Sequence, residues 1–108
     1  MATMEITIIP LGTGTTSASE YIAEATRIAE SSGLKTELTA MGTNLEGDLA
    51  ELLEVARRMH ESCFAKGVKR VYTILKIDDR RDKPSTLEGK VESVRKKLAR
   101  MRSTSETS

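Results

Sequence analysis

The sequence predicts an α+β fold: a ferredoxin-like βαββαβ sandwich with a four-stranded antiparallel sheet, followed by one helix at the C-terminus. Three observations support this prediction. Segments with the two-residue alternation of a strand recur along the chain. Two long segments with the spacing of an amphipathic helix lie between them, in the order β-α-β-β-α-β. A glycine between the two central strands favours a hairpin at that point.

The N-terminal part predicts a strand followed by a helix. Residues 4–9 (MEITII) alternate and are rich in β-branched side chains, and Pro10 is expected to end the strand. A loop of Gly, Thr and Ser occupies residues 12–17. From Ala18 onward, apolar residues recur at helical spacing until Gly33, which is a typical C-terminal residue of a helix.

The central part predicts a hairpin and the longest core helix. Residues 34–41 (LKTELTAM) alternate again, and Gly42 is expected to turn the chain into a short return strand at 43–46. An apolar stripe along residues 48–66 predicts a helix, and Gly67 is expected to end it.

The C-terminal part predicts a strand over residues 69–78 (KRVYTILKID) and a helix over residues 84–101. The apolar residues of that helix repeat in a 4-3-4-3 pattern, which is typical of a two-heptad seam: Leu87, Val91, Val94, Leu98 and Met101. Residues 1–102 are expected to form a single domain, and residues 103–108 (STSETS) are expected to be a disordered tail.

The strand alternation divides the sheet into two faces. The helix-covered face is expected to carry Met4, Ile6, Ile8, Leu34, Leu38, Val71, Leu75 and Ile77. The open face is expected to carry Glu5, Thr7, Ile9, Glu37, Thr39, Met41, Tyr72, Ile74 and Lys76. Because the open face is half apolar, we expect it to serve as a subunit interface or a ligand platform, in a homo-oligomer.

The composition excludes several classes of protein. Only 3% of the 108 residues are aromatic and the net charge is +1, so a nucleic-acid partner is not expected despite the basic segment 95–102. The N-terminus has no signal-peptide pattern, and no apolar run is long enough to span a membrane. The single cysteine, Cys63, fits a reducing compartment, and we expect the protein to be cytoplasmic.

The residues that usually carry chemistry form no complete catalytic or metal-binding motif. The loop GTGTTS follows a strand but lacks the lysine of a phosphate-binding loop, so its role is expected to be hydroxyl contacts from Thr13, Thr15 and Thr16 to a small polar ligand. His60 and Cys63 lie on the apolar stripe of the long helix, where structural roles are favoured. No Cys/His cluster indicates a metal site.

Three further polar residues admit two interpretations each. Thr43 and Glu46 fit simple turn chemistry, and they also fit projection from a rigid edge toward a pocket. Lys76 lies in an otherwise apolar strand, so it is expected to need Glu5, Glu37 or a ligand as partner.

Six stretches of the chain resemble, in order and with matching spacing, the small thiamine-binding protein family, also described as YkoF-like. They are Ile9-Pro10-Leu11-Gly12-Thr13, Met41-Gly42-Thr43, Leu45-Glu46-Gly47, His60-Glu61, Gly67-Val68-Lys69-Arg70-Val71 and Lys76-Ile77-Asp78-Asp79-Arg80. The resemblance covers residues 4–100 and implies a ferredoxin-like fold assembled as dimers, often paired into tetramers. It also implies binding of thiamine or its pyrimidine moiety near a subunit interface, with no required cofactor and no established catalysis.

If the ligand is thiamine, the sequence suggests roles for particular side chains. Glu37 or Glu46 would balance the thiazolium cation, and Lys76 would lie on the same face. Hydroxyls would bond the pyrimidine edge and apolar side chains would pack on a ring; these candidates are Thr13, Thr39, Thr43, Met41 and Ile9.

The sequence therefore favours a non-enzymatic small-molecule binding protein. Two alternatives stay open: an oligomeric regulatory or interaction module that does not bind thiamine, and an enzyme in which His60, Glu46 or Lys76 acts as acid or base.

Overall fold

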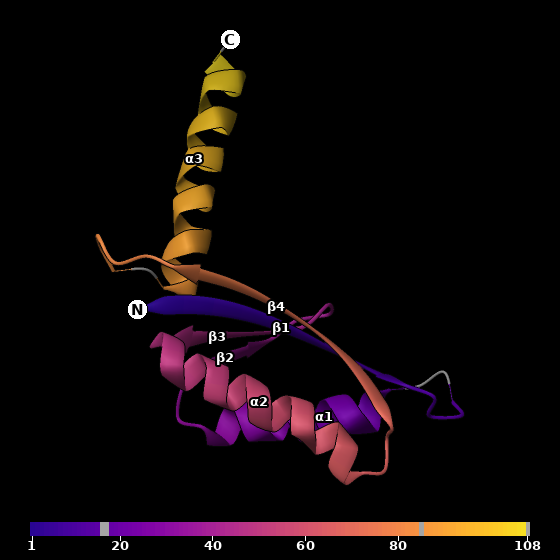
Figure 1. Ribbon diagram of the computed structural model, residues 1–108. Helices are drawn as coiled ribbons and strands as arrows, with labels where there is room; N and C mark the ends of the chain where they lie inside the picture. The colour runs from indigo at the N-terminus through magenta and orange to yellow at the C-terminus, as the bar shows by residue number, and fades with distance from the viewer. Residues whose placement is uncertain (16–17, 85, 108) are drawn as a thin grey trace.

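The computed structural model describes residues 1–15, 18–84 and 86–107, and it confirms the predicted ferredoxin-like arrangement (Figure 1). The elements are β1 (Ala2–Leu11), α1 (Ser19–Ser31), β2 (Lys35–Leu38), β3 (Thr43–Gly47), α2 (Leu49–Ala65), β4 (Arg70–Asp79) and α3 (Leu87–Thr107). The strands form one antiparallel sheet in the order β2-β3-β1-β4. Among the described residues, no helix is long and apolar enough to cross a bilayer.

The core lies between the sheet and the two helices α1 and α2, which cover the same face (Figure 1). Met4, Ile6 and Ile8 of β1 are buried, as the alternation predicts, and Leu45 of β3 lies fully buried beside them. Cys63 of α2 is also fully buried, and burial raises the pKa of its thiol. The core is thus aliphatic, as the lack of aromatic residues requires.

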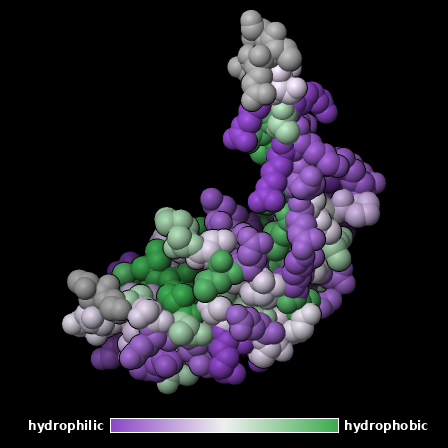
Figure 2. Space-filling view, turned by 180° about the vertical axis from the view of Figure 1, so that it is seen from behind, coloured by the Kyte–Doolittle hydropathy of each residue, from purple (hydrophilic) through white to green (hydrophobic). Residues whose placement is uncertain are grey.

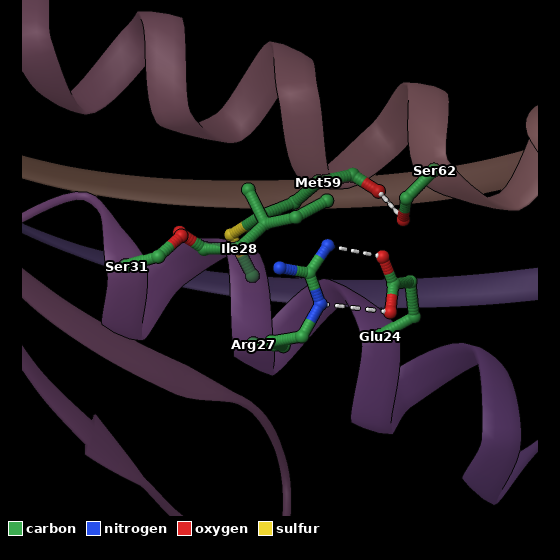
Figure 3. A network of polar contacts seen from close by, with 6 residues as sticks. All are labelled: Glu24, Arg27, Ile28, Ser31, Met59 and Ser62. Atoms are coloured by element: carbon green, nitrogen blue, oxygen red, sulfur yellow. Dashed lines mark hydrogen bonds and ion pairs between the residues drawn. The ribbon is translucent and has the colours of Figure 1, made fainter.

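Helices α1 and α2 pack against each other as well as against the sheet. Figure 3 shows Ile28 of α1 reaching toward Met59 of α2, and both side chains belong to the buried core. The Glu24–Arg27 ion pair lies on the surface of α1, with 2.6 Å between Oε1 of Glu24 and Nη2 of Arg27. Because it is exposed and local, the pair contributes little to stability, whereas the apolar contact between the helices contributes much more.

Strand β1 continues through Pro10 to Leu11, so the expectation that Pro10 ends the strand is wrong. A Cβ on Gly42 would lie 2.8 Å from the Ile6 carbonyl oxygen. The backbone N–H and C=O of Ile6 therefore point toward β3. Backbone direction alternates along a strand, so the backbone of Pro10 faces the same way, away from β4. The missing N–H of proline therefore removes no hydrogen bond from the β1–β4 ladder.

Strand β2 is shorter than the predicted segment 34–41. It ends at Leu38, because the N–H of Thr39 donates to the Gly42 carbonyl at 2.8 Å and closes a tight turn. Leu38 and Leu75 are on the predicted helix-covered side of the sheet but remain 61% and 39% exposed. Both lie on edge strands, which the two helices cover only in part: α2 reaches Thr73 of β4 through His60, but Leu38 and Leu75 stay partly open to solvent.

Helix α3 leaves the sheet at a steep angle and projects away from the rest of the molecule (Figure 1). Its first turn is held by the Leu87 N–H, which donates to Oε2 of Glu46 at 2.8 Å, and by the ion pairs Lys35–Glu88 and Lys90–Asp78. The helix continues to Thr107, whereas a disordered tail is expected from residue 103. Helical hydrogen bonding carries on there, and Thr104 Oγ1 also donates to the Arg100 carbonyl at 3.0 Å.

Truncation of a fully buried leucine tests this assignment of the core. Leu45→Ala is expected to lower the free energy of unfolding by about 2–5 kcal/mol, because it leaves a cavity between the sheet and the helices. Leu53→Ala is the matched control, since Leu53 is 44% exposed, and it is expected to cost less than about 1 kcal/mol. Urea denaturation at one protein concentration measures both, and equal losses would contradict the assignment.

Candidate functional site

One cavity lies beside the part of β1 that extends past Thr43, the first residue of its neighbour β3. Pairing of β1 with β3 ends at Ile6–Thr43, whereas pairing with β4 runs on to Leu11–Arg70. No described strand therefore pairs with the other edge of β1 over residues 7–11. A cavity of about 360 Å³ lies beside this edge. Its described lining is Ile6, Thr7, Ile8, Ile9, Pro10, Thr13, Thr15, Ala18, Ile22, Ala25, Thr26, Leu38, Thr39, Ala40, Met41, Gly42, Thr43 and Met59.

Three parts of the chain that are distant in sequence build the walls of this cavity. They are the free edge of β1, the beginning of α1 with the loop before it, and the turn between β2 and β3. In Figure 1 these parts lie at the end of the sheet opposite the base of α3. Met59 of α2 is 2% exposed and closes the cavity toward the core. The cavity is thus continuous with the core on one side and open on the other.

Threonine hydroxyls supply most of the polar groups of the lining. Thr7 Oγ1 donates to the Met41 carbonyl at 3.0 Å, and Thr39 Oγ1 donates to the Gly42 carbonyl at 2.8 Å. These bonds use the hydroxyl protons to hold the turn in place. Thr39 Oγ1 also accepts the Met41 N–H at 3.3 Å, which leaves it one lone pair for a ligand donor. Thr7 Oγ1 can likewise accept a hydrogen bond from a ligand.

Thr43 differs from these threonines because its hydroxyl has no hydrogen bond in the part of the chain that the structure describes. The residue is 4% exposed and lines the cavity. No fully buried side-chain oxygen of the described residues lacks a hydrogen-bond partner, so the Thr43 hydroxyl is open to water in the cavity, where it can bond a ligand. Thr43 is therefore the polar side chain of the cavity whose surroundings point most directly to a ligand.

The structure brings together five of the residues that the sequence suggests as ligand contacts. Ile9, Thr13, Thr39, Met41 and Thr43 all line the cavity. The cavity wraps around the free edge of β1, so it takes residues from both faces of the sheet rather than from the open face alone.

The three charged candidates lie elsewhere. Glu37 and Lys76 line a separate hollow of about 350 Å³ on the open face, under the first turn of α3. Lys76 Nζ lies 3.8 Å from Oε1 of Glu5, one of its two expected partners, in an exposed pair that contributes little to stability. Glu46 accepts the Leu87 N–H, so it serves as an anchor for α3.

The acid/base candidates do not share a pocket. His60 Nδ1 lies 2.7 Å from Thr73 Oγ1, and the imidazole makes an edge contact with Phe64 at a centroid distance of 5.3 Å. Thr73 and Lys76 are three residues apart on β4, so they point to opposite faces of the sheet. Among the described residues, no group of three His, Cys, Asp or Glu side chains is arranged to hold a metal ion.

Among the described carboxyl groups, lowered pKa values occur in exposed ion pairs. A hydrogen bond from Lys35 lowers the pKa of Glu88, and a hydrogen bond from Arg81 lowers the pKa of Asp79. A carboxyl with a lowered pKa adds stability above its unfolded pKa and loses this contribution as the pH falls. The Lys35–Glu88 contact at the base of α3 is therefore expected to weaken in acid.

The sequence reasoning missed the α1 wall of the cavity. Ile22, Ala25 and Thr26 form this wall, and none of them was suggested as a ligand contact from the sequence. A polar residue inside an apolar helical stripe was the available signal. Thr26 Oγ1 donates to the Ile22 carbonyl at 2.7 Å, one turn earlier in the helix. Thr16, one of the expected loop hydroxyls, lies outside the described residues.

Comparisons with known proteins agree with the fold and with the resemblance noted in the sequence. The sequence model of a family described as "Thiamine-binding protein" matches residues 4–95. The UPF0045 protein YqgV of Bacillus subtilis is 48% identical over 102 residues, which cover 91% of this chain and 98% of YqgV. A UPF0045 protein of Methanothermobacter thermautotrophicus is also 48% identical, over 91% of this chain and 100% of its own.

Solved structures with the same fold include two relatives. The hypothetical protein MJ1052 of Methanocaldococcus jannaschii is 42% identical with a TM-score of 0.80, over 86% of this chain and 94% of its own. A protein of Thermotoga maritima, named as a candidate thiamine biosynthesis/salvage protein, is 25% identical with a TM-score of 0.73. That match covers 86% of this chain and 97% of the Thermotoga chain.

Isosteric replacement of two threonines tests the hydrogen bonds of the cavity. Thr7→Val is expected to lower the free energy of unfolding by about 0.5–1.5 kcal/mol, because it removes the bond to the Met41 carbonyl. Thr43→Val removes a hydroxyl without a partner among the described residues, so stability is expected to stay the same or to rise by up to about 1 kcal/mol. Urea denaturation without ligand compares the two, and a larger loss for Thr43→Val would show that its hydroxyl is bonded.

Proposed function

Since this chain belongs to the thiamine-binding protein family, we propose that it binds thiamine or a related pyrimidine or thiazole compound in the cavity beside the free edge of β1. The observation that carries the proposal is the cavity itself. Its volume of about 360 Å³ and its apolar walls with a few threonine hydroxyls fit one flat heterocycle.

The lining offers complementary groups for an aminopyrimidine ring. Ile9, Ile22 and Met41 provide apolar and thioether surface for the faces of the ring. The hydroxyls of Thr39 and Thr43 lie at the same cavity, where they can bond the ring nitrogens and the exocyclic amine. These contacts make the pyrimidine half of thiamine the better match for the interior.

The thiazolium half of thiamine finds no carboxylate inside the cavity. Glu37 and Glu46, the two residues suggested for that role, lie in the hollow under α3 and at the α3 anchor. The cationic ring therefore extends from the cavity mouth toward water or toward a second subunit. A mouth completed by a second subunit agrees with the ligand position that the family resemblance implies.

We further propose that the chain acts as a binding protein and not as an enzyme. His60, Glu46 and Lys76 point to three different places, so they cannot act on one bound molecule within a single chain. The cavity residues offer hydroxyls without a base to activate them. The buried thiol of Cys63 fits a reducing compartment, and we propose that the protein works in the cytoplasm.

Helix α3 supports the proposal that the chain associates with further copies of itself. Its seam residues Val91, Val94, Leu98 and Met101 are 40–68% exposed. Figure 2 shows green, hydrophobic side chains on the broad part of the molecule next to the base of the projecting helix. The flanks of α3 are basic, whereas the open face of the sheet carries Glu5 and Glu37. A second copy that lays its α3 along this surface would cover apolar and charged groups together.

Ligand binding can be tested by calorimetry and by thermal denaturation with thiamine. Thiamine at 100 times its Kd is expected to stabilise the folded protein by about 2.7 kcal/mol and so to raise Tm. Thr43→Val is expected to weaken binding by about fivefold to tenfold, because a buried hydroxyl contact is lost.

The matched control for this experiment is Thr36→Val. Thr36 is a β2 threonine that donates to the Leu34 carbonyl and does not line the cavity, so its replacement is expected to leave the affinity unchanged. If thiamine at millimolar concentration gives neither heat nor a thermal shift with the folded wild-type protein, thiamine is not the ligand.

Self-association can be tested by light scattering over a concentration series. The double variant Val94→Glu/Leu98→Glu is expected to lower the oligomeric mass at least to half, because it puts charge into the apolar seam. Arg58→Glu changes the net charge by the same amount at an exposed position of α2, away from α3, and is expected to leave the mass unchanged. An unchanged mass for the double variant would mean that α3 is not the assembly element.

A further inference from the structure

The lining of the β1 cavity carries no ionisable side chain. Among the described lining residues there is no Asp, Glu, Lys, Arg or His. Residues 16 and 17 lie outside the described part of the chain, and the sequence there is Thr-Ser, which adds no ionisable side chain. This is unusual for a chain in which 31% of the residues are charged. The cavity is therefore a region of low polarity in a strongly charged molecule.

The free edge of β1 adds backbone donors and acceptors to this uncharged lining. The carbonyl of Ile6 faces the β3 side, so the backbone of Ile8, two residues on, faces the same side. At Ile8 this side has no described partner strand, and Ile8 lines the cavity. Its N–H and C=O lie next to each other, in the spacing that a neighbouring strand would use. A flat ring with a donor beside an acceptor on one edge matches this pair.

We propose that the cavity selects rings that are themselves uncharged and carry no phosphate, such as the pyrimidine of thiamine, and holds them by their donor–acceptor edge against the backbone of Ile8. A charged group would lose its water shell inside and gain no counterion from the described lining, so it must stay outside. The positive end of α1 lies close to the cavity at Ala18, but its partial charge is small compared with the hydration lost by a phosphate. This selectivity rests on the proposed function for the class of ring.

The proposal is tested by measuring the affinity of the cavity for one pyrimidine with and without a phosphate group. Calorimetry at pH 8 uses 4-amino-5-hydroxymethyl-2-methylpyrimidine and its phosphate monoester with the full-length wild-type protein. The monoester is expected to bind at least about tenfold more weakly, because its strongly hydrated dianion meets no counterion in the described lining, whereas the diffuse charge of a thiazolium is only weakly hydrated. Equal or tighter binding of the monoester overturns the proposal and would point to phosphate binding at the start of α1.

Two variants separate the local charge of the cavity from the charge of the whole protein. Met41 lines the cavity and is 79% exposed, so Met41→Lys puts a cation at the mouth without disturbing the core. It is expected to improve binding of the monoester by at least about fivefold. Leu53→Lys makes the same change of net charge on α2, away from the cavity, and is expected to leave both affinities unchanged.

The contact with Ile8 has its own readout. In a 1H–15N NMR titration with the pyrimidine alcohol, the Ile8 amide is expected to shift downfield and to exchange more slowly with solvent. The amide of Lys76 on β4, which lies opposite Glu5 in the β1–β4 ladder and away from the cavity, is expected to stay unchanged. Binding without any change at Ile8 would overturn this part of the proposal.

A further panel distinguishes failure of the selectivity from failure of the proposed function. Cytosine and adenine are tested beside their nucleoside monophosphates, because both are uncharged rings with a donor–acceptor edge. If these rings bind and neither thiamine nor the pyrimidine alcohol does, the proposed function fails and the selectivity stands. If neither thiamine nor any uncharged ring of the panel binds at millimolar concentration, both are overturned.

Discussion

The close approach of Gly42 to β1 is the constraint on which the rest of the structure depends. A Cβ at this position would lie 2.8 Å from the Ile6 carbonyl oxygen and 2.9 Å from Thr7 Oγ1, so any larger residue would push the hairpin away from the sheet. The turn that contains Gly42 is closed by the Thr39 N–H and tied to β1 by the Thr7 hydroxyl. Because the hairpin turns here, β3 begins only at Thr43, opposite Ile6, and β1 beyond Ile6 has no partner on this edge among the described residues.

The open end of the same β2–β3 hairpin holds the first turn of α3. Glu46 lies near the end of β3, and its carboxylate accepts the Leu87 N–H at the beginning of α3. Lys35 at the start of β2 pairs with Glu88 of the same helix turn. One short hairpin thus borders the β1 cavity at its turn and anchors the projecting helix at its base.

The predictable part of the site is the part that depends on residue type. The sequence suggested Ile9, Met41 and the threonines because apolar side chains can pack on a ring and hydroxyls can bond its edge, and all of the suggested ones that the structure describes line the cavity. The charged candidates did not join them. Glu37 and Lys76 were grouped with the others because they share the open face, but a face extends over the whole sheet and the cavity occupies only one end. Alternation assigns a face, whereas the position along the strand depends on register.

By itself, the sequence determined the order of the elements, the covered face of the central strands and the aliphatic nature of the core, because these follow from local periodicity and composition. Only the tertiary structure decided that β1 runs through Pro10, since this depends on which neighbour the proline backbone faces. It also decided where the cavity lies, because a free strand edge is a difference between two pairing lengths. The difference between the β1–β3 and β1–β4 pairing lengths is not encoded in any one segment, because it arises only when the strands pair in register.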